Sequence, residues 1–290
     1  MGIEMHADLE AVLARELAGY TVRSVKPLGA GVDNIAYEVN DELIVRFAAE
    51  PDHERRAEIV RREAQLLDAL GEFSSLPVPE PVLASPDDGF LAYHKLPGVP
   101  LASLPEPQRV GPRFAATMAE FLTRLHSAPV SQLRNLVDVA LEPLEHWLGY
   151  ARSDYLNVVG SIPPAVRKPI ESLLAAPVPE ANFAPAFCHN DLGSEHVLVD
   201  SDSRECTGIR DWTDAAISDP ARDFGRLYRD CGPTVVDAAL AGYGGGQDLR
   251  ERAIFYGRCA VFEDIAHGLA TGKRMYAQNA IAALGWLFPA

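Results

Sequence analysis

Cysteine is scarce in this sequence, and long apolar runs are absent. The four cysteines, Cys188, Cys206, Cys231 and Cys259, lack the CxxC or zinc-like spacing of redox and metal motifs. No apolar run reaches the ~18 residues of a membrane-spanning helix, and the opening MGIEMHADLE lacks the basic and apolar pattern of a signal peptide. We therefore expect a cytoplasmic protein with reduced thiols and no membrane partner.

Basic residues are also few, with 26 Lys and Arg against 41 Asp and Glu, which gives a net charge of -15. Nucleic acid requires a basic footprint to neutralise its phosphates, so we expect no nucleic-acid partner. The surplus of carboxylates suits a cationic small molecule, because an acidic cleft raises the local concentration of cations. A generally acidic, solvated surface would give the same net charge.

The residues that carry chemistry gather in one stretch, 187–214, with the sequence FCHNDLGSEHVLVDSDSRECTGIRDWTD. It contains two short apolar strand-like segments with polar groups at their ends. Asp191 and His196 precede the first segment and Asp211 follows the second, so we expect the three side chains to converge. A carboxylate base with two ligands for a divalent ion is what phosphoryl transfer needs. The spacing is that of a kinase catalytic loop, with His196 at the usual Asn position.

This stretch resembles the aminoglycoside phosphotransferases, which are small-molecule kinases. It is more similar to their 2''-phosphotransferase branch, in the triplet His189-Asn190-Asp191, in His at 196, and in DAAISDP at 214–220 followed by Asp223-Phe224. Macrolide phosphotransferases are also similar and carry His at the second metal position too. The resemblance runs from Gly29 to about Leu269.

The resemblance implies an α+β, protein-kinase-like two-lobed fold that uses Mg²⁺ and GTP or ATP. A small, β-rich N-terminal lobe that binds nucleotide is expected over residues 1–96, with a hinge at 93–98. A larger, mainly helical lobe for catalysis and acceptor binding is expected over 97–290. The local pattern agrees, because strand-like runs occupy much of 22–47 and helical spacing of apolar residues begins near 109.

Two glycines and one charged pair of the first lobe are candidates for holding the nucleotide. Gly29 and Gly31 of GAGVDN would offer backbone N–H groups to phosphate, although a plain hairpin turn has the same pattern. Arg46 interrupts the apolar run LIVRF, and Glu63 interrupts the apolar stripe of the next helix. A kinase pairs a strand Lys with a helix Glu at these places. Arg can also grip phosphate, and a solvated Arg and Glu remain the alternative.

The segment 93–96 is expected to bind the nucleotide base. Backbone groups near His94 and Leu96 would hydrogen-bond the base, and Tyr93 would narrow the pocket. An aromatic residue in a strand is more often part of the core, so Tyr93 has that alternative.

Each residue of the central stretch has an expected role. Asp191 would accept the proton of the acceptor hydroxyl or orient it. Asp211 would bind Mg²⁺. Imidazole is not a preferred Mg²⁺ ligand, so His196 either follows the resemblance as a second ligand or merely orients a carboxylate. His189 would brace the loop, and Asp223 would tie the motif to the lobe through backbone N–H groups.

The acceptor side is expected to be acidic. Asp214 matches an acidic position near the acceptor in the 2'' branch and is a candidate for binding an ammonium group. The segment GRLYRDCGP departs from that branch, because Asp230 is its one acidic residue and two arginines accompany it. Glu263 and Asp264 on the last long helix would compensate, unless they belong to a solvated helix face.

These observations predict a kinase that transfers the terminal phosphoryl group of GTP or ATP to a hydroxyl of an aminoglycoside-type antibiotic and so confers resistance. The expected partners are a nucleoside triphosphate and a cationic small molecule. One alternative is a macrolide phosphotransferase, whose pocket would be larger and more apolar. A second, of another class, is a non-catalytic nucleotide-binding protein, which Arg46 and His196 would suggest by replacing the usual Lys and Asn.

Overall fold

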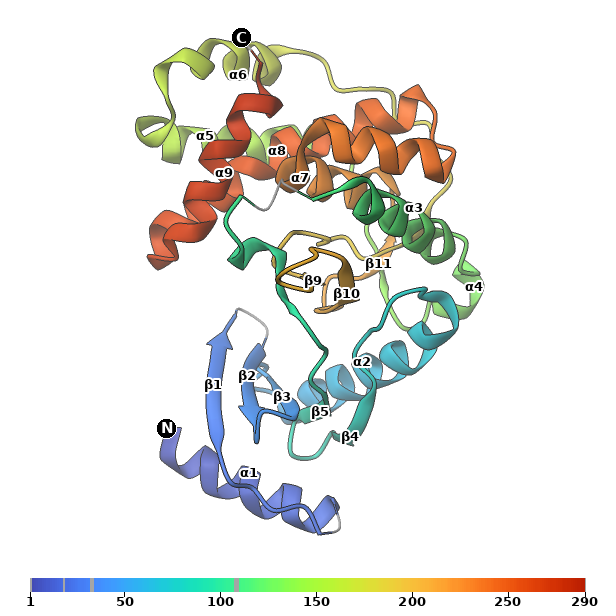
Figure 1. Cartoon of the computed structure of the whole chain (residues 1–290), viewed down its shortest axis with the longest axis vertical. Helices are drawn as coiled ribbons and strands as arrows, with labels where there is room; N and C mark the ends of the chain where they lie inside the picture. Colours follow the sequence, from blue (N-terminus) through green and yellow to red (C-terminus); the bar gives the residue numbers. More distant parts are fainter. Residues whose placement is uncertain (1, 18, 32–33, 107–109, 290) are drawn as a thin grey trace. The chain divides into compact units, whose positions relative to one another are not determined.

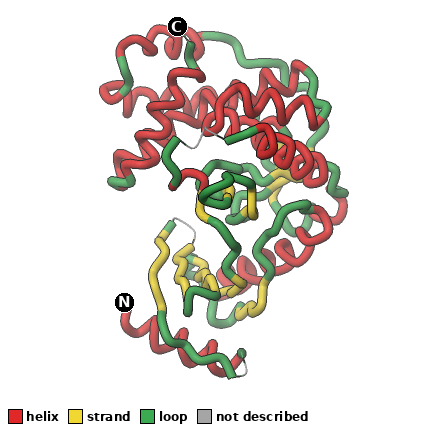
Figure 2. Tube along the Cα trace, in the orientation of Figure 1, coloured by secondary structure: helices red, strands yellow, loops and turns green. Residues whose placement is uncertain are grey.

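The computed structural model describes residues 2–17, 19–31, 34–106 and 110–289, and the chain divides into two compact units. The first unit comprises residues 1–72 and 77–96, and the second comprises residues 73–76 and 97–290. The first unit is built on a β-sheet with two helices, and the second is mainly helical (Figures 1 and 2). Among the described residues, no helix is both long and apolar enough to cross a membrane.

The first unit is a five-stranded antiparallel sheet with two helices. Its strand order is β1-β2-β3-β5-β4. The strands are β1 (Val25–Ala30), β2 (Asn34–Val39), β3 (Leu43–Ala48), β4 (Pro81–Ser85) and β5 (Phe90–His94). The helices are α1 (Gly2–Glu16) and α2 (His53–Phe73). Apolar residues of α1 pack with alternate residues of β3 and β5 into one core, because side chains on a strand alternate between the two faces of the sheet.

The second unit is mainly helical. Its α-helices are α3 (Pro112–His126), α4 (Val130–Leu133), α5 (Leu144–Val158), α6 (Pro164–Ala175), α7 (Ala221–Tyr243), α8 (Gln247–Thr271) and α9 (Arg274–Leu287). Two short 3₁₀ turns, η1 (Leu101–Ser103) and η2 (Val159–Ser161), accompany them. The helix α7 is kinked at Gly232, which has a φ of 78° and is followed by Pro233.

Two small sheets of the second unit carry the central stretch. Their strand orders are β10-β9-β6 and β7-β11-β8. The strands are β6 (Val99–Pro100), β7 (Asp138–Val139), β8 (Ala186–Cys188), β9 (Val197–Val199), β10 (Cys206–Ile209) and β11 (Ala216–Ser218). The two apolar segments predicted in the central stretch are β9 and β10, which pair antiparallel. The side chains expected to converge therefore stand in the loops that flank this hairpin.

Two glycines let α7 and α8 approach closely. A Cβ added at Gly257 of α8 would lie 2.7 Å from the carbonyl oxygen of Gly225 of α7. A Cβ added at Gly225 would lie 2.7 Å from Cβ of Tyr256. Such distances leave no space for a methyl group unless the helices separate. This contact sets which side chains of α7 stand beside those of α8.

We expect Gly257→Ala to lower the free energy of unfolding by about 1–3 kcal/mol, because the added methyl group would overpack a helix contact. The matched control is Gly149→Ala in α5, where nothing lies within 4 Å of an added Cβ. That change should be neutral or raise stability by about 0.5–1 kcal/mol through helix propensity. Urea denaturation of both variants measures the difference, and equal effects would contradict the packing argument.

Candidate functional site

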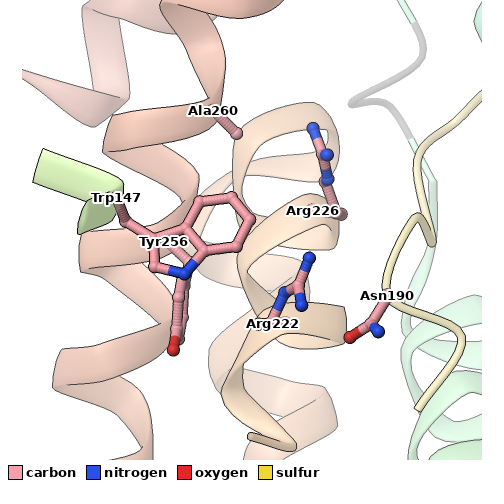
Figure 3. A pocket seen from close by; sticks show the side chains of 6 residues that line it. All are labelled: Trp147, Asn190, Arg222, Arg226, Tyr256 and Ala260. Carbon is pink, nitrogen blue, oxygen red and sulfur yellow. The ribbon is translucent and has the colours of Figure 1, made fainter. Parts of the chain in front are cut away.

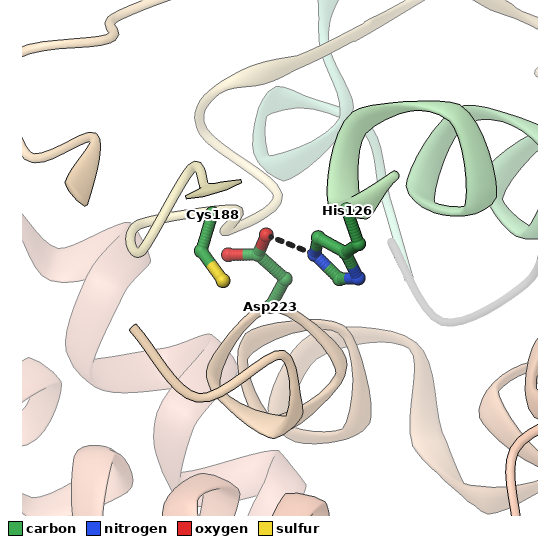
Figure 4. A group of neighbouring side chains, drawn as sticks. All are labelled: His126, Cys188 and Asp223. Atoms are coloured by element: carbon green, nitrogen blue, oxygen red, sulfur yellow. Dashed lines mark hydrogen bonds and ion pairs between the residues drawn. The ribbon is translucent and has the colours of Figure 1, made fainter. Parts of the chain in front are cut away.

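A buried carboxylate at the start of α7 holds the loop that carries Asp191. Asp223 accepts the backbone N–H of His189 (3.0 Å) and of Asn190 (2.7 Å). Its Oδ2 also lies 3.1 Å from Nε2 of His126 (Figure 4). Burial raises the pKa of Asp223, but the hydrogen bond and charge of His126 and the contacts with His189 lower it by more. The expectation that Asp223 ties the motif through backbone N–H groups is confirmed.

His189 braces the same loop as a neutral imidazole. The backbone N–H of Asp191 donates to Nδ1 of His189 (3.3 Å), so the ring proton lies on Nε2. That Nε2 group donates to the carbonyl oxygen of Arg210 (3.1 Å). Burial lowers the pKa of His189, which favours the neutral ring. The expected bracing role is therefore present in the structure.

The backbone is left-handed at two positions of the site. Asn190 has a φ of 66° and Asp211 a φ of 62°, a conformation that Asn and Asp tolerate better than most residues. Nδ2 of Asn190 donates to the carbonyl oxygen of Asp214 (3.0 Å), and Oδ1 of Asp211 accepts from Thr213 (3.0 Å). The first bond joins the Asp191 loop to the turn that carries Asp211. The two predicted carboxylates thus lie on directly connected segments.

Asp191 contacts one imidazole and one guanidinium. Its Oδ2 lies 3.1 Å from Nε2 of His196, and its Oδ1 lies 3.2 Å from Nε of Arg226. Burial raises the pKa of Asp191, but Arg226, His196 and Arg229 lower it by more, so the carboxylate is ionised and weakly basic. An ionised carboxylate can orient a hydroxyl and accept its proton late in the reaction.

His196 combines a bonded and an unbonded ring nitrogen. Its Nε2 faces Asp191, while its Nδ1 is buried and has no hydrogen-bond partner among the described residues. Burial lowers the pKa of His196, but the hydrogen bond to Asp191 and the charges of Glu195, Asp191 and Asp211 raise it by more. His196 therefore has the geometry to orient the carboxylate of Asp191, which was the alternative to metal binding. Its Nδ1 has no hydrogen-bond partner among the described residues.

The donor set fits a divalent cation that is shared with substrate phosphates. Mg²⁺ is usually bound in proteins by one or two carboxylates together with phosphate oxygens. Asp211 would supply a carboxylate, and the buried Nδ1 of His196 would supply a second donor in the neutral form of the ring. A nitrogen donor is less suited to Mg²⁺ than oxygen, so Asp211 would contribute most of the affinity.

The carboxylates predicted to bind acceptor amines lie against arginines of α7. Arg229 is almost fully buried, with its Nε 2.6 Å from Asp230 and its Nη1 2.9 Å from Asp264. Nη2 of Arg226 lies 3.7 Å from Glu263. Burial raises the pKa of Asp264 to about 8 despite Arg229, so the cluster holds less negative charge than its carboxylates suggest.

Asp214 differs from Asp230 and Asp264 in its exposure, which it shares with Glu263. It is exposed, in the turn that follows Asp211, and its carbonyl oxygen accepts the bond from Asn190. Among the described acidic residues predicted for the acceptor, it is the one whose backbone is hydrogen-bonded to the Asp191 loop.

In the first unit, the expected contact between Arg46 and Glu63 is present. Nη1 of Arg46 lies 2.7 Å from Oε1 of Glu63, and the side chains are only 6% and 11% exposed. Neither side chain is therefore solvated, which contradicts the alternative of a solvated Arg and Glu. A buried pair of this kind needs a reason beyond stability, because desolvation offsets much of its attraction.

The other predicted nucleotide residues have ordinary surroundings. Gly29 lies in β1, and the N–H of Gly31 donates to the carbonyl oxygen of Asn34 (2.8 Å), which closes a hairpin. Residues 32 and 33 of the same turn lie outside the described residues. Tyr93 is buried in β5, as the core alternative expects, whereas His94 at the end of the strand is exposed and Leu96 is half-buried.

Sequence reasoning missed the arginines of α7 as site residues. Arg222, Arg226 and Arg229 recur at four- and three-residue steps, which places them on one face of the helix. This spacing is visible in ARDFGRLYRD, directly after the motif. It gives no indication that the arginine face turns toward Asp191, because that contact joins residues 35 positions apart in the chain.

The chain is similar to known phosphotransferases in sequence. The model of a family described as "Phosphotransferase enzyme family" matches residues 24–255. Viomycin phosphotransferase of Streptomyces vinaceus is 28% identical over 250 residues, which are 82% of this chain and 83% of that protein. The uncharacterized protein YcbJ of Bacillus subtilis (strain 168) is 27% identical over 188 residues, and the match spans 59% of the length of each.

Solved structures are similar over nearly the whole chain. The GDP and kanamycin complex of APH(2")-IIia has a TM-score of 0.70 and 25% identity, and 97% of each chain is covered. Macrolide 2'-phosphotransferase type I has a TM-score of 0.66 and 21% identity, again with 97% of each chain covered. The expected α+β, kinase-like fold and the resemblance to antibiotic phosphotransferases are thereby confirmed.

We expect Asp223→Ala to lower the free energy of unfolding by at least about 2 kcal/mol, because two buried N–H groups would lose their acceptor. The control is Asp237→Ala on the same helix, whose partner Arg250 is 35% exposed. Loss of that surface pair should cost no more than about 1 kcal/mol. Urea titrations compare the two variants, and similar losses would mean that Asp223 does not hold the loop.

Proposed function

Because the chain belongs to the phosphotransferase enzyme family, we propose that it transfers the terminal phosphoryl group of GTP or ATP to a hydroxyl of a small molecule. The observation that carries this proposal is the ionised Asp191, held by Asp223 and His189 on a loop beside Asp211. A small-molecule acceptor agrees with the relatives, one of which is named a viomycin phosphotransferase.

Asp191 acts on the acceptor hydroxyl in the proposed reaction. It accepts a hydrogen bond from the hydroxyl, whose oxygen forms a bond to the terminal phosphorus as the bridging oxygen leaves with the nucleoside diphosphate. The hydroxyl proton passes to Asp191 and then to solvent. A weakly basic carboxylate suffices, since the transition state of phosphoryl transfer is loose and needs little deprotonation.

The nucleotide is assigned to the first unit and the metal to the central stretch. Residues 1–96 would bind the nucleotide, with Arg46 positioned on its phosphates by Glu63, backbone groups of Gly29 and Gly31 on phosphate oxygens, and the hinge at 93–98 on the base. Asp211 and His196 would hold Mg²⁺, which neutralises negative charge on the phosphates when it is bound.

An antibiotic acceptor is the narrower form of the proposal. The aminoglycoside class is supported by the APH(2")-IIia structure with kanamycin and by the exposed Asp214. A macrolide is the second candidate, because Asp230, Glu263 and Asp264 lie against arginines and contribute little net negative charge for amines. A protein that merely binds nucleotide would not need Asp191 to be held in this way.

We expect purified protein with Mg²⁺ and GTP or ATP to release nucleoside diphosphate in the presence of one acceptor from a panel of antibiotics. Asp191→Ala should lower kcat by at least about 100-fold through loss of the orienting carboxylate, with nucleotide affinity unchanged. A coupled assay measures turnover and calorimetry measures affinity. Turnover within a few-fold of the parent protein would remove Asp191 from the mechanism.

We expect Arg46 and Glu63 to be energetically coupled in nucleotide binding. A double-mutant cycle of Arg46→Met and Glu63→Gln should give a coupling energy of about 1 kcal/mol or more, as contacting charges do. Arg23 and Glu42, whose side chains are 64% and 53% exposed, form the control pair, with an expected coupling below about 0.5 kcal/mol. Strict additivity at Arg46 and Glu63 would separate the pair from nucleotide binding.

A further inference from the structure

The second unit has a pocket beside Asp191 in which every charged lining residue is an arginine. Its lining residues are Trp147, Asn190, Arg222, Arg226, Tyr256 and Ala260. Asn190 precedes Asp191 in the chain, and Arg226 contacts the carboxylate of Asp191. The pocket therefore adjoins the proposed catalytic carboxylate. Figure 3 shows both guanidinium groups on one face of α7, between the Trp147 ring and Asn190. A group bound there lies next to the acceptor hydroxyl.

The two arginines of the pocket differ in their counter-charges. Arg226 has Asp191 at 3.2 Å and Glu263 at 3.7 Å. Within the described part of the chain, no carboxylate lies within ion-pair distance of Arg222, whose one hydrogen bond runs from Nη1 to Oγ of Ser218 (3.3 Å). Burial and nearby Arg226 lower the pKa of Arg222 by more than Tyr256, Asp223 and Cys188 raise it.

This arrangement is unfavourable unless something anionic occupies the pocket. Arg222 and Arg226 are four residues apart on one helix, where like charges repel. The guanidinium of Arg222 lies 4.4 Å from the centroid of the Trp147 ring, which fixes its plane. Of its five N–H donors, most remain available to a ligand. A fixed fork of this kind matches the two oxygens of a carboxylate or phosphate.

We propose that the acceptor of this kinase carries an oxyanion group, a carboxylate or a phosphate, which Arg222 and Arg226 bind next to its reactive hydroxyl. This inference rests on the proposed phosphotransferase function and replaces its narrower aminoglycoside form with an acceptor that carries an acidic group. A flat or apolar part of the acceptor packs against Trp147 and Tyr256. As Arg226 turns to the oxyanion, its hold on Oδ1 of Asp191 weakens, and that oxygen takes the acceptor hydroxyl.

The same pocket disfavours a polycation. An ammonium group placed there would face two guanidinium groups, and the carboxylates nearest to them are already paired. The pocket is small, with about 10 Å³ of cavity volume, which is room for about one water molecule or one oxygen of an oxyanion. It therefore takes the anionic end of an acceptor, and the remainder extends beyond it.

Binding of simple probes tests the pocket without turnover. We expect benzoate, phenyl phosphate or both to bind the full-length protein at least tenfold more tightly than benzyl alcohol, and benzylamine not to bind. Ligand-observed NMR gives the affinities, and the two anions show which oxyanion is preferred. Arg222→Gln should reduce anion affinity at least tenfold. The control Arg250→Gln, at the other end of the α7–α8 pair, should leave it unchanged.

Stability separates a binding role from a structural one. Arg222→Gln loses the contact with Trp147 and the hydrogen bond to Ser218 but also removes the repulsion from Arg226, so the thermal unfolding temperature should change little. If Arg222 merely packs on Trp147, the variant would be destabilised and benzoate binding would not depend on it, which would overturn the proposal.

An acceptor screen distinguishes this inference from the proposed function. Nucleotide turnover is compared for hydroxy compounds that are anionic, neutral or cationic. Turnover with cationic acceptors, together with no binding of the anionic probes, would overturn the oxyanion site and leave the kinase intact. Binding of the probes through Arg222 without turnover of any acceptor would support the site and count against the kinase. The expected result is turnover that depends on an acidic group and on Arg222.

Discussion

The carboxylate of Asp223 is the constraint on which the rest of the site depends. It satisfies two consecutive backbone N–H groups and one imidazole while fully buried, so the loop from His189 to Asp191 has one favourable position. A buried N–H without an acceptor costs more than most side-chain contacts contribute, which makes this arrangement close to obligatory. The left-handed backbone of Asn190 and the neutral His189 then fix where Asp191 stands.

The number of carboxylates that contact an arginine rises along α7. The arginines at 222, 226 and 229 meet progressively more carboxylate, from none within ion-pair distance among the described residues, through Asp191 and Glu263, to Asp230, Asp264 and Glu195. The charge of Arg229 is neutralised by carboxylates of the protein, whereas Arg222 has no ion pair among the described residues. A net charge of -15 therefore says little about the site, because exposed carboxylates elsewhere set the total while local pairing sets the field in the pocket.

The sequence predicted what depends on local pattern. The motif around Asp191 indicated the kinase-like fold, the hairpin of β9 and β10 followed from two apolar segments, and Arg46 and Glu63 were matched because each interrupts an apolar run. It did not predict that Asp230, Glu263 and Asp264 would lie against arginines. The contacts of Glu263 and Asp264 depend on how α7 faces α8, which involves the close approach of Gly225 and Gly257, and no periodicity within either helix encodes it. The roles in nucleotide, metal and acceptor binding remain predictions.

One helix carries both the anchor of the Asp191 loop and a wall of the proposed acceptor pocket. Asp223 lies between Arg222 and Arg226 in sequence, and Gly225 of the same segment packs closely against Gly257 of α8. A change of acceptor preference in evolution could not proceed by shifting α7, since any shift would also displace Asp191. New preferences would have to arise by exchange of single side chains on a stationary frame, at positions 222 and 226 first. Chains of this family with the same backbone could thus diverge widely in what they phosphorylate.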